Sequence, residues 1–166
     1  MGQAFTVWLH LLAVSIWIGP QFFMFLAALP AIREIGDRQL RARVMRIVVT
    51  RFGYLAWGAL VIIVLTGISN LLQSDFSKQW DPDFRYVNVF ATKMTILGLT
   101  VALTATHTFV IGPRQLRLAE EPEPSEADSA MLRRSSIILS SVALVGSIAT
   151  LFCGALLGNS WSQNPV

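Results

Sequence analysis

Long runs without charge divide the chain into four apolar segments. Residues 1–32, 52–74 and 135–166 contain no Asp, Glu, Lys or Arg, and residues 86–112 contain only Lys93. A helix of about 20 apolar residues crosses the roughly 30 Å hydrocarbon core of a bilayer. The pattern therefore predicts an all-α fold, an integral membrane four-helix transmembrane bundle in one domain over residues 1–166. The predicted spans are about 5–31, 52–73, 88–112 and 136–158.

The composition supports a membrane protein. Hydrophobic residues make up 54% of the chain and charged residues 14%, against about 25% charged residues in a typical soluble domain. This balance excludes a disordered chain and leaves too few charges to coat a soluble globule. The single cysteine, Cys153, excludes a disulfide scaffold. The first run has no basic segment and is longer than a signal peptide allows, so we expect it to be retained as a span in the lipid bilayer.

The arginines predict how the spans are oriented. Six arginines lie between the first two predicted spans and four between the last two, whereas only Lys78 and Arg85 lie between the second and third. Basic loops stay in the cytoplasm, so both termini are expected outside a bacterial-type inner membrane. The basic pI of about 9.6 is then a topology signal and not a sign of nucleic-acid binding. We expect residues 34–51 to form a helical extension along the inner surface, and residues 120–126 to form a linker broken by proline.

The only two histidines, His10 and His107, both fall inside predicted spans, where polar groups are costly and often functional. At 1.5 Å per residue, His10 lies about 12 Å outward of its span centre and His107 about 10 Å inward. A difference of about 20 Å in depth means that one metal ion or haem cannot take both as ligands from one chain. His107 shares a helix face with Lys93, Thr100 and Thr104, and it marks either a second site or an ordinary polar contact.

Three further polar or soft side chains, Lys93, Met94 and Cys153, share the outer half with His10. Imidazole, thioether and thiolate together suit Cu(I), and His with Met is an axial pair for haem iron. The alternatives are a cross-helix hydrogen bond for His10, interfacial anchoring for Lys93, and plain packing for Met94 and Cys153. The pattern identifies no catalytic residue. It gives as cofactor-binding candidates His10, Lys93, Met94 and His107, and as metal ligands His10, Met94 and Cys153.

Three stretches of the chain resemble known membrane families. They read WLHLLAVSIWIGPQFFMFLAALPAI, RFGYLAWGALVIIVLTGISNLL and FATKMTILGLTVALTA. Their order resembles the CopD copper-resistance membrane family: an early Leu-His, a W-x-G, an R-F entry, an L-T-G-x-x-N-L-L exit, and a Lys opening the next helix. The chain is also similar to the HemJ protoporphyrinogen oxidases, four-helix proteins with a haem b. The key His and Lys of that family would correspond to His10 and Lys93.

These observations predict a protein that holds a redox metal centre in its outer half, for electron transfer or for copper or haem handling. The centre is a b-type haem or a copper ion, and the sequence leaves the choice open. One alternative is a HemJ-like protoporphyrinogen oxidase, and another is a cofactor-free accessory subunit. We expect a homo-oligomer such as a homodimer, or a subunit of a larger membrane complex. Whether the protein is an enzyme stays open, with an oxidoreductase as the expected class if it is one.

Overall fold

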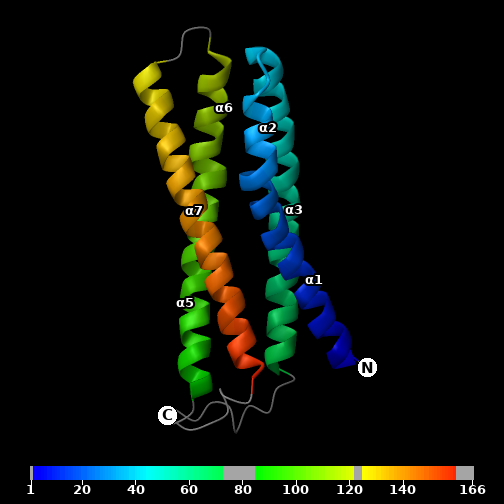
Figure 1. Ribbon diagram of the computed structural model, residues 1–166. Helices are drawn as coiled ribbons and strands as arrows, with labels where there is room; N and C mark the ends of the chain where they lie inside the picture. The colour runs from blue at the N-terminus through cyan, green and yellow to red at the C-terminus, as the bar shows by residue number, and fades with distance from the viewer. Residues whose placement is uncertain (1, 73–84, 122–124, 160–166) are drawn as a thin grey trace.

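The four predicted spans are four long helical rods (Figure 1). The computed structural model describes residues 2–72, 85–121 and 125–159, and no strand occurs among them. The all-α transmembrane fold predicted from the sequence is thereby confirmed. The first rod comprises α1 (Gly2–Phe23), the π-helical turn η1 (Met24–Ala28) and α2 (Leu29–Arg33), and the second is α3 (Arg38–Leu72). The third comprises α5 (Arg85–Thr106), the π-helical turn η2 (His107–Ile111) and α6 (Gly112–Glu120), and the fourth is α7 (Glu126–Leu157).

The helices extend further than predicted at the arginine-rich end of the bundle, called here the arginine end. Residues 34–51 were expected to be a helical extension along the inner surface. Their helical character is confirmed from Arg38 onward, but the course along the surface is wrong, because α3 continues in line from Arg38 as one helix of 35 residues (Figure 1). No proline interrupts it, so nothing forces the backbone to turn. Its length of about 52 Å exceeds the hydrocarbon core of a bilayer. The predicted linker shortens to the residues after Glu120 and before Glu126, of which 122–124 lie outside the described residues.

Side-chain caps start both helices that run away from the arginine end. Asp37 Oδ1 accepts hydrogen bonds from the backbone N–H groups of Gln39 at 2.8 Å and Leu40 at 3.1 Å. Ser125 Oγ accepts one from Asp128 N–H at 3.3 Å. Both caps satisfy backbone donors that a first helical turn leaves free.

Each π-helical turn lies just before a proline. In η1 the residue before Pro30 donates its backbone N–H to Met24 O, and in η2 the residue before Pro113 donates to His107 O. Both bonds reach five residues back instead of four. A proline lacks an N–H and clashes with the carbonyl four residues before it, and the wider turn relieves this clash without breaking the rod.

The rods form two helical hairpins. α1 packs along α3 in the N-terminal hairpin (residues 2–72), and α5 packs along α7 in the C-terminal hairpin (residues 85–157). Thr100 of α5 is only 2% exposed and lies against Gly146 of α7, where a Cβ would collide with its hydroxyl. At the arginine end, Arg38 donates to the backbone carbonyl of Glu121 at 2.7 Å and joins the hairpins. The buried apolar core lies mainly in the first hairpin and comprises Ala13, Trp17, Ala59, Leu60 and Ile63.

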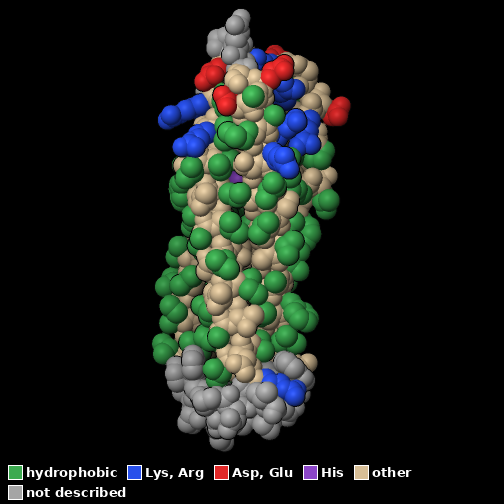
Figure 2. Space-filling view, turned by 90° about the vertical axis from the view of Figure 1, so that its left-hand side faces the viewer, with side chains coloured by type: hydrophobic (Ala, Val, Ile, Leu, Met, Phe, Trp, Pro, Cys, Tyr) green, Lys and Arg blue, Asp and Glu red, His purple; other side chains and the backbone are tan. Residues whose placement is uncertain are grey.

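Apolar side chains cover most of the outside of the bundle. Figure 2 shows hydrophobic groups along the length of the rods, and most of the charged groups gathered at the arginine end. In each candidate span, at most 22% of the most apolar window is buried, so the hydrophobic surface faces outward. Lipid is the solvent that such a surface requires, and helices satisfy their own backbone groups within it. The chain is therefore a multi-pass membrane protein.

Candidate metal-binding site

His10 of α1 is held by a threonine of the neighbouring helix. Its Nδ1 atom lies 2.8 Å from Thr66 Oγ1 on α3. The hydroxyl of Thr66 donates its own proton to Ile62 O at 2.6 Å, so its oxygen accepts from the ring. In this arrangement Nδ1 carries the ring proton and donates it to Thr66.

This hydrogen bond leaves the second ring nitrogen available. With the proton on Nδ1, the Nε2 atom of a neutral imidazole keeps its lone pair, which is the form that binds metals. The ring lies against Gly67, where an added Cβ would be 3.5 Å from the ring carbon Cε1. The cross-helix hydrogen bond, which was the alternative to a ligand role for His10, is therefore present. It uses one ring nitrogen and leaves the other free for a ligand.

Lys93 and Cys153 lie on α5 and α7, in the same half of the bundle as His10. Lys93 of α5 lies against Gly154 of α7, where an added Cβ would be 3.7 Å from its Nζ atom. Cys153 is buried and free of any disulfide. The structure therefore places Lys93 of α5 beside the Cys153–Gly154 segment of α7, in the same half of the bundle as His10.

Met94 lies on another face of α5. Its side chain is 46% exposed, because one residue along a helix turns the side-chain direction by about 100°. The structure gives it no contact with His10 among the residues it describes. Of the residues predicted to lie in the outer half with His10, Met94 is the one that the structure does not place with Lys93 and Cys153.

Asn70 adds a polar atom that the sequence did not single out as a site residue. It lies one turn after Thr66 on α3, and its Oδ1 atom is buried without a hydrogen-bond partner in the described part of the chain. A buried unpaired oxygen is uncommon in proteins, and an ion or water is one explanation for it. We call His10, Thr66, Asn70, Lys93 and Cys153 the far-half cluster, because they lie in the half away from the arginine end.

His107 belongs to a separate place in the bundle. Its Nε2 atom lies 2.8 Å from Ser136 Oγ on α7, at the start of the turn η2. It lies fourteen positions after Lys93 on the same helical rod, which corresponds to about 21 Å along the axis. The structure therefore agrees with the predicted separation of the two histidines in depth.

A polar contact between the two hairpins lies at a depth between that of His10 and that of His107. The indole N–H of Trp17 donates to Ser147 Oγ at 3.2 Å, and the amide of Gln21 donates to the same oxygen at 3.3 Å. Ser147 is 4% exposed and in turn donates to Ala143 O at 2.9 Å. The sequence analysis missed this network, although a Gln one turn after a Trp in an apolar span was a visible signal.

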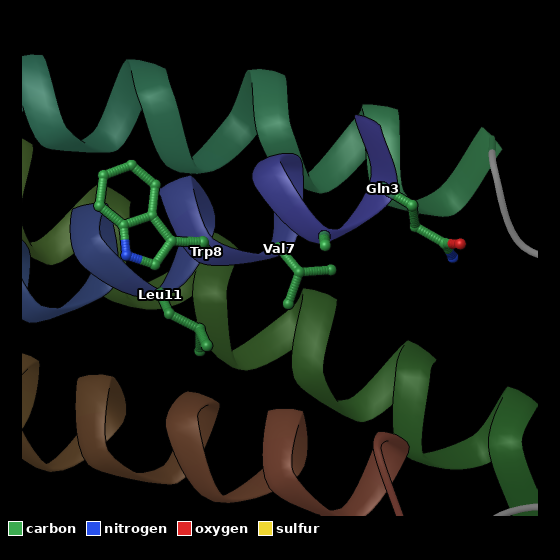
Figure 3. Close-up of a pocket in the computed structure, with 5 residues that line it drawn as sticks. Gln3, Val7, Trp8 and Leu11 are labelled. Carbon is green, nitrogen blue, oxygen red and sulfur yellow. The ribbon is translucent and has the colours of Figure 1, made fainter. Parts of the chain in front are cut away.

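A shallow depression of about 490 Å³ lies on α1 near its N-terminal end. Figure 3 shows Gln3, Val7, Trp8 and Leu11 projecting from successive turns of this helix; together with Ala4 they line the depression. Trp8 and Leu11 are more than half exposed. A hollow formed by one helix and open to the lipid side has no converging polar groups, so it does not resemble a ligand site.

The described residues include no group of three His, Cys, Asp or Glu side chains placed to hold a metal ion. A closed site with three such ligands therefore does not fit this part of the chain. A site with fewer and softer ligands does fit, because the far-half cluster offers the Nε2 lone pair of His10 and the sulfur of Cys153.

Comparison with known proteins gives one match. A family model described as copper resistance protein D matches residues 46–157, a range that includes Lys93, His107 and Cys153 and begins after His10. No curated protein and no solved structure matches. The comparison thus supports the predicted CopD resemblance, and it gives no support to similarity with HemJ.

Proposed function

Because the chain belongs to the copper resistance protein D family, whose name marks it as copper-related, we propose that it binds Cu(I) in the far half of the bundle and hands it on. His10 Nε2 is the first ligand in this proposal. The observation that carries it is the bond from His10 Nδ1 to Thr66 at 2.8 Å, which leaves the lone pair on the other nitrogen. Protein partners that fix the tautomer in this way are typical of histidine ligands.

Cys153 is the proposed second ligand. Its sulfur is buried in the same half as His10, and the next residue, Gly154, lies against Lys93. A thiolate with an imidazole is a soft ligand pair that favours Cu(I) over harder cations. Asn70 Oδ1, which is buried and unpaired, provides an acceptor near Thr66 for a water that travels with the ion.

The proposed location is the outer side of the membrane. The arginine end carries ten of the thirteen Lys and Arg residues, and such an end stays in the cytoplasm. The far-half cluster then faces the outside of a bacterial-type inner membrane. A site with few ligands near that surface suits an ion that is received and passed on, since a full set of ligands would retain it.

The experiment that tests this function compares the two histidines. Each is bonded to a hydroxyl of a neighbouring helix at 2.8 Å, so His107→Ala is a matched control for His10→Ala. The purified protein in detergent competes for Cu(I) with the chelator bicinchoninate under anaerobic conditions. We expect His10→Ala to weaken Cu(I) binding by about 100-fold and Cys153→Ser by ~10-fold or more, whereas His107→Ala stays within about threefold of wild type.

Equal loss of affinity in both histidine variants would contradict the proposed site, as would no loss in His10→Ala. The same preparations decide between copper and haem. A Soret band with reduced-state α and β bands that disappears in His10→Ala would replace copper handling with a b-type haem, and with it the electron-transfer alternative. A folded protein that takes up neither would favour the cofactor-free accessory subunit.

A further inference from the structure

An aromatic pair joins the two hairpins on the outside of the bundle, below the arginine end. Trp57 of α3 and Phe109 of η2 lie with their ring centroids 5.3 Å apart. Phe109 is 65% exposed, so this pair is open to the surroundings on one side. Toward the arginine end, α3 continues beside α6. We call the surface formed by α3, η2 and α6 from the ring pair to the arginine end the α3–α6 seam.

Two arginines of α3 lie on the same helix face as Trp57. Arg46 and Arg43 precede Trp57 by 11 and 14 positions, which correspond to about three and four helical turns. α3 is an α-helix without a proline over these residues, so the three side chains stay in phase. Tyr54, which lies about one turn before Trp57, is 77% exposed. The face therefore changes from rings to a phenol and then to arginines.

The other side of the seam has the same order. Arg114 and Arg117 follow Phe109 by five and eight positions, and both are exposed. The bond from Gly112 N–H to His107 O reaches five residues back, so η2 takes in one extra residue. Five positions therefore amount to about one turn here and eight to about two, which keeps both arginines on the face of the exposed ring.

The positive charge of the seam is not neutralised by its own chain. Arg43, Arg114 and Arg117 are exposed and form no ion pair within the part of the chain that the structure describes. A guanidinium pairs its N–H groups with phosphate oxygens. Arg114 and Arg117 lie about 7–12 Å along the rod from Phe109. A phosphate on these arginines would therefore have apolar rings beneath it, within reach of an attached acyl chain.

We propose that the α3–α6 seam binds an anionic phospholipid, with its phosphate on the arginines and an acyl chain along Trp57 and Phe109. Basic pockets between membrane helices bind anionic headgroups, and exposed aromatic residues such as Tyr54 are typical of the level where headgroups meet chains. A second copy of this chain would not suit the seam, because a two-fold contact would bring arginines against arginines. The proposal is independent of the copper site, which lies in the other half.

Native mass spectrometry of the delipidated protein in detergent tests the headgroup contact. The probes are dioleoylphosphatidylglycerol, dioleoylphosphatidylcholine and inorganic phosphate. Arg114→Gln/Arg117→Gln removes two charges from the seam. Arg133→Gln/Arg134→Gln is the matched control, since it removes two exposed charges from α7, on the other side of α6 at the same end (Figure 1).

The expected results follow from the charges. Wild type should bind phosphatidylglycerol about tenfold or more tightly than phosphatidylcholine. The seam variant should bind phosphatidylglycerol about 30-fold more weakly than wild type, whereas the α7 variant should stay within about threefold. Equal weakening in the two arginine variants would overturn the proposal, because net charge and not the seam would then attract the lipid. Equal wild-type affinities for the two lipids would also overturn it, and this comparison needs no variant to fold.

A second pair of variants tests the chain contact. Phe109→Ala removes the exposed ring of the seam, and Phe152→Ala removes a ring of similar exposure, 63%, from the far half of α7. We expect phosphatidylglycerol affinity to fall about fivefold in the first and to stay within about twofold of wild type in the second. Equal affinities in the two variants would overturn the chain contact. Inorganic phosphate that displaces the lipid at equal concentration would show a site for free phosphate and would overturn the lipid proposal.

Discussion

Thr66 holds the His10 ring by Nδ1 at 2.8 Å while giving its own proton to Ile62 O. With the Thr66 proton on Ile62 O, the hydroxyl oxygen accepts from Nδ1–H, and Nε2 is then the ring nitrogen that carries the lone pair. A hydroxyl on the adjacent helix therefore determines whether the histidine can act as a metal ligand.

Removing that hydroxyl is expected to weaken Cu(I) binding. Thr66→Val keeps the shape of the side chain and loses the acceptor for Nδ1–H, so the ring is free to rotate and to exchange tautomers. The expected loss is about tenfold in Cu(I) affinity, at the lower end of the range for partners of metal-binding histidines. Thr66→Ser keeps the acceptor and should retain most of the affinity. Equal affinities for the Val and Ser variants in the bicinchoninate competition would contradict the role of Thr66.

Gly146 is expected to be essential for the packing of the second hairpin. A Cβ at this position would collide with Thr100 Oγ1, so Gly146→Ala should lower the stability by about 1–3 kcal/mol. Gly98→Ala is the matched control on α5, because an added Cβ there meets nothing within 4 Å. Reversible unfolding in mixed micelles measures both. Adding Thr100→Ala to Gly146→Ala should recover part of the loss, and the absence of any recovery would show that another contact is responsible.

The hydroxyl of Ser147 is expected to contribute modestly to the joining of the two hairpins. It accepts hydrogen bonds from Trp17 and Gln21, so Ser147→Ala leaves two donors without this acceptor. Hydrogen bonds between membrane helices average about 0.6 kcal/mol, with a maximum of about 1.7, and the expected loss of stability is of that size. Ser15→Ala is a suitable control, since within the described part of the chain Ser15 bonds its own helix, at Leu11 O. Losses of equal size in the two variants would argue against a role between the hairpins.

The arginine end is expected to face the cytoplasm. In a Cys153→Ser background, single cysteines at Ser125 and Gly158 test the two ends of α7. An impermeant maleimide added to intact cells should label Ser125→Cys only after the membrane is opened, whereas Gly158→Cys should react at once. The reverse labelling pattern would place the far-half cluster on the cytoplasmic side.

Hydropathy and charge were sufficient to predict the spans, because the uncharged runs are longer than the membrane core is thick. They did not predict where α3 begins, since a helix continues beyond the lipid for as long as its backbone permits. Depth along a span was also predictable, and it separated His10 from His107. Direction around the helix was not, so Met94 was predicted as a metal ligand and Lys93 only as a cofactor-binding residue, although only Lys93 faces Gly154.

The most direct test of the central claim is X-ray absorption at the copper edge of the Cu(I)-loaded protein in detergent. The account predicts a copper ion with one imidazole and one sulfur ligand, with the imidazole scattering lost in His10→Ala and kept in His107→Ala. Imidazole scattering that persists unchanged in His10→Ala and disappears in His107→Ala would contradict it.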